Sequence, residues 1–126
     1  MVFVCPKCKQ KALKISSSLE LPSDGRSDEI SLQILECNKC NFKSLGVYEE
    51  SKRGAIDSYS FNHQGYIVNY EVLELFREKI NECNQPKNSK CSCSVHRYFN
   101  RVNDSGRWNF LDEIEILGKY NIILSP

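Results

Sequence analysis

Four cysteines in the first third of the chain have the residue type and spacing of metal ligands. They form two pairs, Cys5 with Cys8 and Cys37 with Cys40, and two residues separate the cysteines of each pair. A turn of this length can aim both sulfurs at one point, and its backbone N–H groups can donate to the thiolates. Two such turns facing each other supply four thiolates in tetrahedral geometry, which Zn2+ adopts in closed structural sites. We therefore predict a zinc site with four cysteine ligands.

Two other uses of these cysteines remain open. A single Cys-x-x-Cys pair is also typical of a redox dithiol, but that reading explains one pair in a βαβ context and not two pairs around a β-patterned insert. Iron also accepts four thiolates in this geometry, so the residues alone do not distinguish iron from zinc.

The remaining cysteines, Cys83, Cys91 and Cys93, precede a nearby histidine, His96. Together with the first four cysteines they make eight ligands, which is two sets of four, and we predict a second zinc site of three cysteines and one histidine. A site with four protein ligands leaves no open position for water, which argues against metal-dependent hydrolysis. The alternatives are a buried Cys83 on an amphipathic face, surface thiols, and a disulfide or redox-active trio.

Composition and charge restrict the function classes. The chain has 126 residues, a hydrophobic share of 40% and a formal net charge of +1, which suits one domain or a small domain with an appended module. A zinc ion with four thiolates carries a net charge of −2, so the metal-loaded protein is neutral to slightly acidic. This balance weakens the case for non-specific DNA binding, which depends on phosphate neutralisation.

The chain shows no signal for a membrane or for secretion. Four residues precede Cys5, too few for a signal peptide, and no apolar run is long enough to span a bilayer. We therefore expect a cytoplasmic location, where cysteines stay reduced and available to metal.

The first half of the chain has the pattern of a three-stranded antiparallel zinc ribbon. Lys11 to Leu21 alternates, with Leu13, Ile15, Ser17, Leu19 and Leu21 on one face, and Glu29 to Glu36 alternates with Ile30, Leu32 and Ile34 on one face. Phe42 to Tyr48 is the expected third strand. We assign the ribbon to residues 1–54.

The second half, residues 55–126, is expected to form a small α+β lobe packed on the ribbon. Ser58 to Val68 has aromatic residues on both sides of the segment 62–65, which favours a hairpin with its turn there. We expect an amphipathic helix from Asn69 to Cys83. Further elements are a short helix that Ser94 caps, a helix over Trp108 to Leu117 and a closing strand over Tyr120 to Leu124. The predicted fold class is α+β.

A basic stretch lies in the second half and contains Lys87, Lys90, Arg97, Arg101 and Arg107. Tyr98 and Phe99 lie between these basic residues, and Trp108 follows them. Basic and aromatic side chains together can contact phosphates and stack on bases. The aromatic residues are more economically explained as the core of a small metal-stabilised lobe, and the basic residues can equally face an acidic protein.

No catalytic signature is present in the sequence. We find no serine–histidine–aspartate order, no phosphate-binding glycine loop and no metalloprotease motif. His63 is expected to be a solvated or hydrogen-bonded histidine. We therefore do not expect an enzyme, and no small-molecule substrate is evident.

The order CPKC, strand, RSDE, strand, CNKC resembles the zinc ribbon of transcript-cleavage elongation factors and related RNA polymerase subunits. In that family an acidic pair at the hairpin tip reaches into the polymerase and helps to hold a catalytic Mg2+. The resemblance implies that Asp28 and Glu29 form this pair beside Arg26, since carboxylates are suitable Mg2+ ligands. The sequence lacks one residue of the family's segment at the hairpin tip, and it lacks the family's polymerase-docking domain. A solvated turn explains the same four residues.

The sequence thus predicts a non-catalytic zinc-binding module, with two Zn2+ ions, that contacts a protein or a nucleic acid. The surfaces expected to bind are the tip with Arg26, Asp28 and Glu29 and the basic stretch with Arg97, Arg101 and Arg107. Two other functions remain open. One is an auxiliary factor of the transcription machinery that acts through the acidic tip, and the other is a redox or metal-responsive switch that uses the second group of cysteines.

Overall fold

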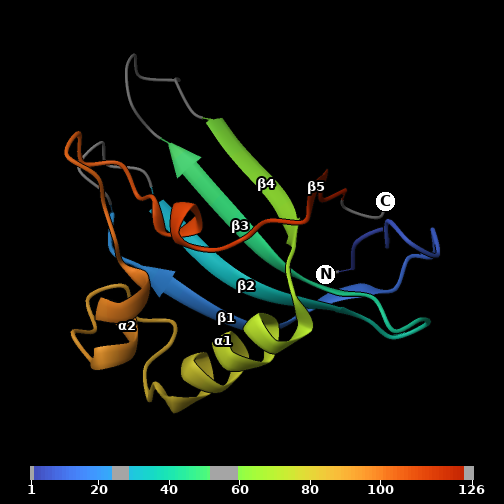
Figure 1. Ribbon diagram of the computed structural model, residues 1–126, viewed down its shortest axis with the longest axis horizontal. Helices are drawn as coiled ribbons and strands as arrows, with labels where there is room; N and C mark the ends of the chain where they lie inside the picture. The colour runs from blue at the N-terminus through green and yellow to red at the C-terminus, as the bar shows by residue number, and fades with distance from the viewer. Residues whose placement is uncertain (1, 24–28, 52–59, 124–126) are drawn as a thin grey trace.

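The computed structural model describes residues 2–23, 29–51 and 60–123, and its main element is a five-stranded antiparallel sheet (Figure 1). The strands follow one another across the sheet in chain order, and each pairs with the next. The strands are β1 (Leu13–Leu21), β2 (Glu29–Cys37), β3 (Lys43–Ser51), β4 (Ser60–Ile67) and β5 (Gly118–Asn121).

The α+β class and the first three strands agree with the sequence-based prediction. The sheet does not end at the third strand, because β4 pairs with β3 from Leu45 to Ser51, and β5 pairs with β4. The predicted boundary between residues 54 and 55 lies outside the described residues, so the division into two units stays a prediction.

A β-bulge at Ser16 changes which face of the sheet β1 contacts. The pairing register with β2 shifts between Ile15 and Ser17. Because successive side chains of a strand alternate between the two faces, one extra residue moves all later side chains to the other face. Leu13 therefore faces the first group of cysteines, whereas Leu19 lies in the main core. The prediction that alternate residues from Leu13 to Leu21 share one face is wrong for this reason.

Two helices, α1 (Tyr70–Glu82) and α2 (Ser94–Phe99), cover one face of the sheet (Figure 1). The main core lies between these helices and the first three strands, and Leu73, Phe76 and Ile80 are the buried residues of α1. The predicted Ile30, Leu32 and Ile34 face of β2 is part of this core. The core also includes Phe99 and Trp108, and Tyr98 packs against it partly buried, so the prediction of a core is confirmed for the first two and holds in part for Tyr98.

The helix α1 begins and ends where the sequence predicts. The Asn69 side chain accepts a hydrogen bond from the backbone N–H of Glu71 at 2.8 Å, which satisfies one of the unpaired donors of the first turn. At the other end, Cys83 is the C-cap and its backbone N–H donates to the Ile80 carbonyl. The amphipathic helix therefore brings Cys83 to the edge of the core.

Two predicted elements of the second half are wrong. Residues 62–65 form no hairpin turn, because β4 runs without interruption from Ser60 to Ile67. The predicted helix over Trp108 to Leu117 is only a short 3-10 helix, η1 (Phe110–Glu113), and Ile114 is already extended. Gly118 consequently begins β5 and does not end a helix. The predicted closing strand corresponds to β5 but begins and ends earlier.

The N-terminal segment connects two distant parts of the chain. Phe3 exchanges backbone hydrogen bonds with Leu13 at 2.8 and 3.0 Å, and the Val4 N–H donates to the Ile123 carbonyl at 3.0 Å. Both ends of the described chain therefore lie at the same end of the molecule (Figure 1). Behind this segment is a second, smaller core of Phe3, Cys5, Ala12, Leu13, Leu35 and Cys37.

Candidate metal centres

The first metal centre is built from two turns at the end of the sheet next to the N-terminal segment. Cys5 and Cys8 lie in a turn that the Lys9 N–H closes by donating to the Cys5 carbonyl at 2.9 Å. Lys9 has a φ of 65°, a conformation uncommon outside glycine, and it turns the chain back toward β1. The first pair of sulfurs is thereby held in a turn anchored at Leu13.

The second turn follows β2 directly. Cys37 is the last residue of β2, and the backbone N–H of Lys39 donates to its Sγ at 3.4 Å. The Cys37 N–H donates to the Phe42 carbonyl at 3.0 Å, which brings the chain back toward β3. The β2–β3 hairpin therefore presents Cys37 and Cys40 on one side of a short connection.

The four sulfurs of the first centre lie at the spacing of a tetrahedral metal site. Cys5 Sγ is 3.7 Å from Cys40 Sγ, and Cys8 Sγ is 3.7 Å from Cys37 Sγ. All four lie within 4.8 Å of one another. Four thiolates around a Zn2+ ion at about 2.3 Å stand about 3.8 Å apart, which these separations match. All four cysteines are free, so no disulfide competes for them.

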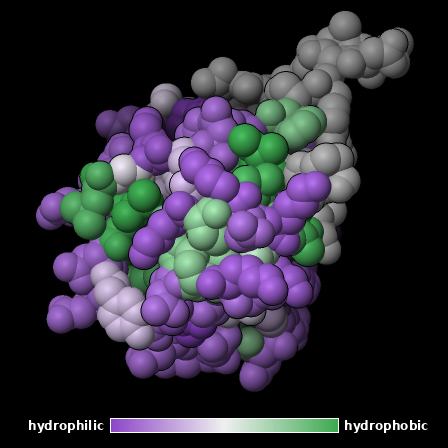
Figure 2. All heavy atoms as spheres, turned by 90° about the vertical axis from the view of Figure 1, so that its right-hand side faces the viewer, coloured by the Kyte–Doolittle hydropathy of each residue, from purple (hydrophilic) through white to green (hydrophobic). Residues whose placement is uncertain are grey.

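An apolar and aromatic layer covers the first centre. Tyr120 and Ile122 pack on the small core that contains Cys5 and Cys37. The Tyr120 hydroxyl is 2.7 Å from Ser44 Oγ, and its ring lies directly over Gly65, where a Cβ would come within 2.2 Å of ring atoms. Figure 2 shows this end of the molecule, where the hydrophobic side chains form separate patches among hydrophilic ones.

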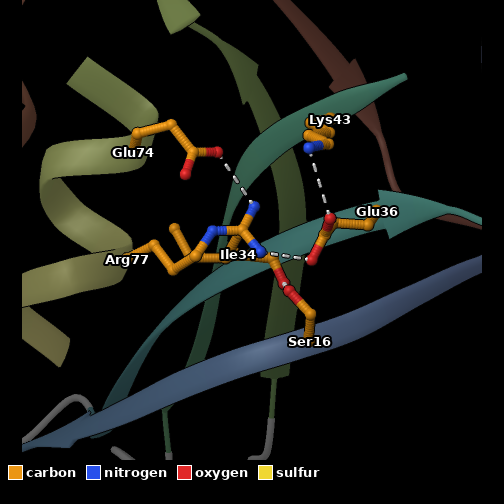
Figure 3. Close-up of polar contacts among 6 residues, drawn as sticks. All are labelled: Ser16, Ile34, Glu36, Lys43, Glu74 and Arg77. Atoms are coloured by element: carbon orange, nitrogen blue, oxygen red, sulfur yellow. Dashed lines mark hydrogen bonds and ion pairs between the residues drawn. The ribbon is translucent and has the colours of Figure 1, made fainter. Parts of the chain in front are cut away.

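A charged cluster supports the strand that carries Cys37. Glu36 precedes Cys37, and its carboxylate accepts a hydrogen bond from Arg77 of α1 at 2.6 Å and lies 3.6 Å from Lys43 Nζ of β3 (Figure 3). The hydrogen bond from Arg77 lowers the pKa of Glu36, against the opposing effect of burial. Glu74 lies on the other side of the guanidinium at 3.4 Å. This cluster fixes α1 to β2 next to the first centre.

The second metal centre joins the end of α1 to the start of α2. The sulfurs of Cys83, Cys91 and Cys93 and one ring nitrogen of His96 lie within 4.8 Å of one another. Cys83 Sγ is 3.9 Å from Cys91 Sγ, 3.5 Å from Cys93 Sγ and 3.4 Å from His96 Nδ1. The N-cap of α2 is Cys93 and not Ser94, and its Sγ accepts from the His96 N–H at 3.4 Å.

His96 is oriented so that one ring nitrogen is available to a metal. The ring is buried, and Nε2 lies 3.0 Å from the backbone carbonyl oxygen of Glu20. A carbonyl oxygen only accepts, so Nε2 must carry the proton. The neutral ring then has its lone pair on Nδ1, which is 3.2 Å from Cys93 Sγ. Metal-bound histidines are commonly fixed in this way by an acceptor on the other nitrogen.

The thiol pKa values differ within each centre. Burial raises the pKa of Cys37, but N–H donors from Lys39 and Cys40 and hydrogen bonds from neighbouring thiols outweigh it, and the result is about 7. For Cys93, the backbone N–H and then the ring of His96 lower the pKa to about 6. Burial raises the pKa of Cys83 to about 11.

For Cys40, the Phe42 N–H favours the thiolate, but burial and the other thiols raise the pKa to about 12. The pKa values of Cys37 and Cys93 are thus the ones lowered toward neutral pH, and a thiol must lose its proton to serve as a metal ligand.

The residues predicted to bind a partner belong to two separate stretches of the chain, the tip and the basic stretch, and only some of them lie within the described residues. Arg26 and Asp28 lie outside the described residues, and Glu29 is the first residue of β2. Arg97 is exposed on α2, but Arg101 lies beyond the end of that helix and does not share a helix face with it.

Both Arg101 and Arg107 have acidic neighbours in the structure. Arg101 pairs with Glu113 at 2.7 Å, and Arg107 lies 3.7 Å from Glu49. Their charges are therefore partly neutralised within the molecule.

His63 is hydrogen-bonded, as predicted. Its Nε2 lies 2.7 Å from the side-chain oxygen of the buried Gln33, and its ring makes edge contacts with Phe3 and Tyr48. Burial lowers the pKa of His63.

Sequence reasoning missed two parts of the metal centres. The carbonyl of Glu20 orients His96, but every residue has a carbonyl, so no residue type marks this role. Tyr120 covers the first centre from the far end of the chain, and the only signal for it is an aromatic residue in an apolar segment.

Comparisons of the chain with protein-family models, with curated proteins and with solved structures find no match. Among the described residues, none of the helices has the length and apolar character needed to cross a membrane.

Proposed function

We propose that this protein is a non-catalytic binding module whose fold is held by two structural zinc ions. The observation that supports this most directly is the orientation of His96, since its Nε2–H is given to Glu20 and Nδ1 faces the three sulfurs. A histidine that served only as a core residue would have no need to place an unprotonated nitrogen among three thiols.

The ligand types favour zinc over harder metals. Seven thiolates and one imidazole suit Zn2+, whereas Mg2+ and Ca2+ prefer oxygen ligands. Both groups supply four ligands, and such closed sites stabilise structure because no coordination position remains for a substrate or an attacking water. Iron with four thiolates in the first centre is the other metal that this geometry admits.

The two ions would cross-link separate turns of the chain. The first centre fixes the turn at residues 5–8, and the second fixes the loop between α1 and α2. A structural zinc site contributes on the order of 10 kcal/mol to folding in small domains, which is comparable to the whole stability of many of them. Rigid loops on a small sheet are suited to contact a protein or a nucleic acid, and the exposed Arg97 and the tip around Glu29 are candidate contact points.

The test is native mass spectrometry with elemental analysis of protein purified without added metal. We expect two zinc ions per chain, one fewer in Cys37→Ser and one fewer in Cys93→Ser. The matched control is Ser92→Ala, which lies between two ligands and should keep both ions. A folded chain without metal would overturn the proposal, and iron in the first centre would correct the metal alone.

A second candidate is a redox-responsive switch at the second centre. The observation that favours it is a cavity of about 350 Å3 lined by Cys83, Cys91 and Cys93, of which the last two are partly exposed. Hydrogen peroxide that enters there could oxidise two thiolates to a disulfide: the O–O bond and two metal–sulfur bonds break, the S–S bond forms, two protons from water complete two water molecules, and the ion is released. Rapid, reversible loss of one zinc with peroxide would favour this function, whereas unchanged zinc content would exclude it.

A further inference from the structure

The outer edge of β1 is closed at both of its ends. This strand is the first in the sheet, so only one side of it pairs with another strand. At its start Leu13 exchanges backbone hydrogen bonds with Phe3, and near its end the Glu20 N–H donates to the Pro86 carbonyl at 2.8 Å. Both contacts lie on the side of β1 that faces away from β2.

Between these two contacts the edge has outward backbone groups. In an antiparallel pair, residues two apart direct their N–H and C=O groups to the same side. The backbone N–H and C=O groups of Ile15 therefore point outward, as those of Leu13 do. Beyond the bulge, the backbone groups of Ser18 point outward as those of Glu20 do, because the two residues are two apart in one register. Neither Ile15 nor Ser18 makes an outward backbone hydrogen bond to any other part of the chain that the structure describes.

A groove follows this open part of the edge. Its volume is about 390 Å3, and it lies between β1 and the last turn of α1, with the Pro86–Lys87 loop at one end. The half-exposed Ile15 supplies apolar surface, the buried Ile80 of α1 lies beneath it, and the serines at 16, 17 and 18 are small enough for another backbone to approach. Lys87 is the charged residue among those that line the groove, and its Nζ donates to Ser18 Oγ at 2.8 Å.

We propose that this groove binds an extended, acidic segment of a partner protein, which adds to β1 as a short sixth strand. Strand addition to an open edge uses the backbone for affinity and alternate side chains for specificity. The six residues from Lys14 to Leu19 leave room for about 20 Å of extended chain. An acidic residue in the segment would pair with Lys87, with Lys14 exposed on the same strand.

A second copy of this chain fits the edge less well. If two β1 edges paired in antiparallel fashion, Phe3 of one copy would occupy the place of the other copy's Glu20, and Pro86 that of Leu13, because Phe3 and Pro86 already pair with the outer edge at its two ends. A single peptide strand avoids this clash. The inference rests on the proposed function, since it specifies the surface and the partner class of the binding module.

The test uses two capped heptapeptides that alternate valine with glutamate or valine with lysine. The holoprotein with measured zinc content is titrated with each peptide, and backbone amide shifts are followed by NMR. We expect the glutamate peptide to shift the amides of Ile15 and Ser18 and to bind about threefold more tightly than the lysine peptide, as for one cross-strand charge pair. Lys87→Glu should reverse this preference, whereas Lys119→Glu on β5 should leave it unchanged.

A backbone variant separates strand addition from simple charge attraction. Ser18→Pro removes the outward N–H, a change that an edge strand tolerates because that N–H is not used within the sheet. We expect it to abolish binding, whereas Ser18→Ala keeps the N–H and should bind. Two versions of the glutamate peptide can be made, N-methylated at the odd or at the even residues. The version that loses the N–H groups facing β1 should fail to bind, and the other should still bind.

Each outcome bears on one proposal. If the zinc-loaded, folded protein binds neither peptide, or if the shifts map away from Ile15 and Ser18, the strand-addition inference is overturned and the zinc module remains. If two copies of the chain associate through these amides without peptide, the acidic partner is likewise overturned. A folded protein without zinc would overturn the proposed function, whatever the peptides do.

Discussion

His96 Nε2 lies 3.0 Å from the carbonyl oxygen of Glu20, and this contact connects the second metal centre to β1. The adjacent Glu20 N–H donates to Pro86, which lies in the loop between the second-centre ligands Cys83 and Cys91. The same residue of β1 therefore contacts the second centre through both of its backbone groups. Loss of this centre should consequently weaken the hydrogen bonds of Glu20 and destabilise this end of β1.

We expect His96→Ala to bind one metal ion where the parent chain binds two. The substitution removes a candidate ligand and the Nε2–H that donates to the Glu20 carbonyl, so metal affinity at this centre should fall by more than the roughly 10- to 100-fold that follows the loss of an outer-shell partner alone. Elemental analysis and hydrogen exchange at Glu20 would check this. His63→Gln is the matched control and should retain both ions, and two ions in His96→Ala would contradict the prediction.

Removal of metal by a chelator should lower the melting temperature by tens of degrees or unfold the chain. The reason is that a structural zinc contributes on the order of 10 kcal/mol, about as much as the total stability of a small domain. Circular dichroism during the titration, followed by addition of zinc to restore the signal, would measure the effect. An unchanged melting curve after both ions are lost would show that neither centre supports the fold.

Glu36→Gln should lower the free energy of unfolding by about 1–2 kcal/mol at pH 7 through loss of the hydrogen-bonded ion pair with Arg77. The pKa of Glu36 is lowered in the folded protein, mainly by this hydrogen bond, so the ionised form favours folding. Its contribution is therefore complete above the ordinary pKa of a glutamate and is lost as the pH falls through the folded value.

Denaturant unfolding of both proteins between pH 8 and pH 3 would test this, with the difference constant above about pH 5 and shrinking below it. Glu74→Gln is the control, because its 3.4 Å contact to Arg77 is longer and its effect should be smaller. A difference that grows toward acid would have the wrong sign for our account.

Gly65→Ala should destabilise the protein by about 1–3 kcal/mol, the usual cost of overpacking. A Cβ at this position would lie 2.2 Å from the Tyr120 ring, which would have to move away from Ser44 and from the cover of the first centre. Gly118→Ala is the control, since its nearest contact of 3.5 Å is ordinary. Equal melting temperatures for the two variants would refute this explanation.

Elements that depend on local pattern could be predicted from the sequence. Alternation in β2 and a capped amphipathic helix at Asn69 are local signals, and the structure has both. Residue type and spacing alone group the eight candidate metal ligands, and the structure brings them together as two sets of four.

The rest could not be predicted because it depends on contacts between distant residues. Gly65 has the residue type of a turn, but it is needed where Tyr120, which lies more than 50 residues later, packs on the backbone. Ser16 has no property that distinguishes it from Ser17 and Ser18, yet the bulge there reverses the facing of β1. The orientation of His96 likewise depends on a backbone atom of Glu20.

The cover that Tyr120 and Ile122 place over Cys5 and Cys37 has a consequence for biosynthesis. All four sulfurs of the first centre leave the ribosome about 80 residues before this lid does, which at translation rates of 5–20 residues per second is a delay of roughly 4 to 16 seconds. The nascent chain would thus present the four cysteines of the first centre in a form accessible to zinc before Tyr120 and Ile122 are synthesised and can cover them.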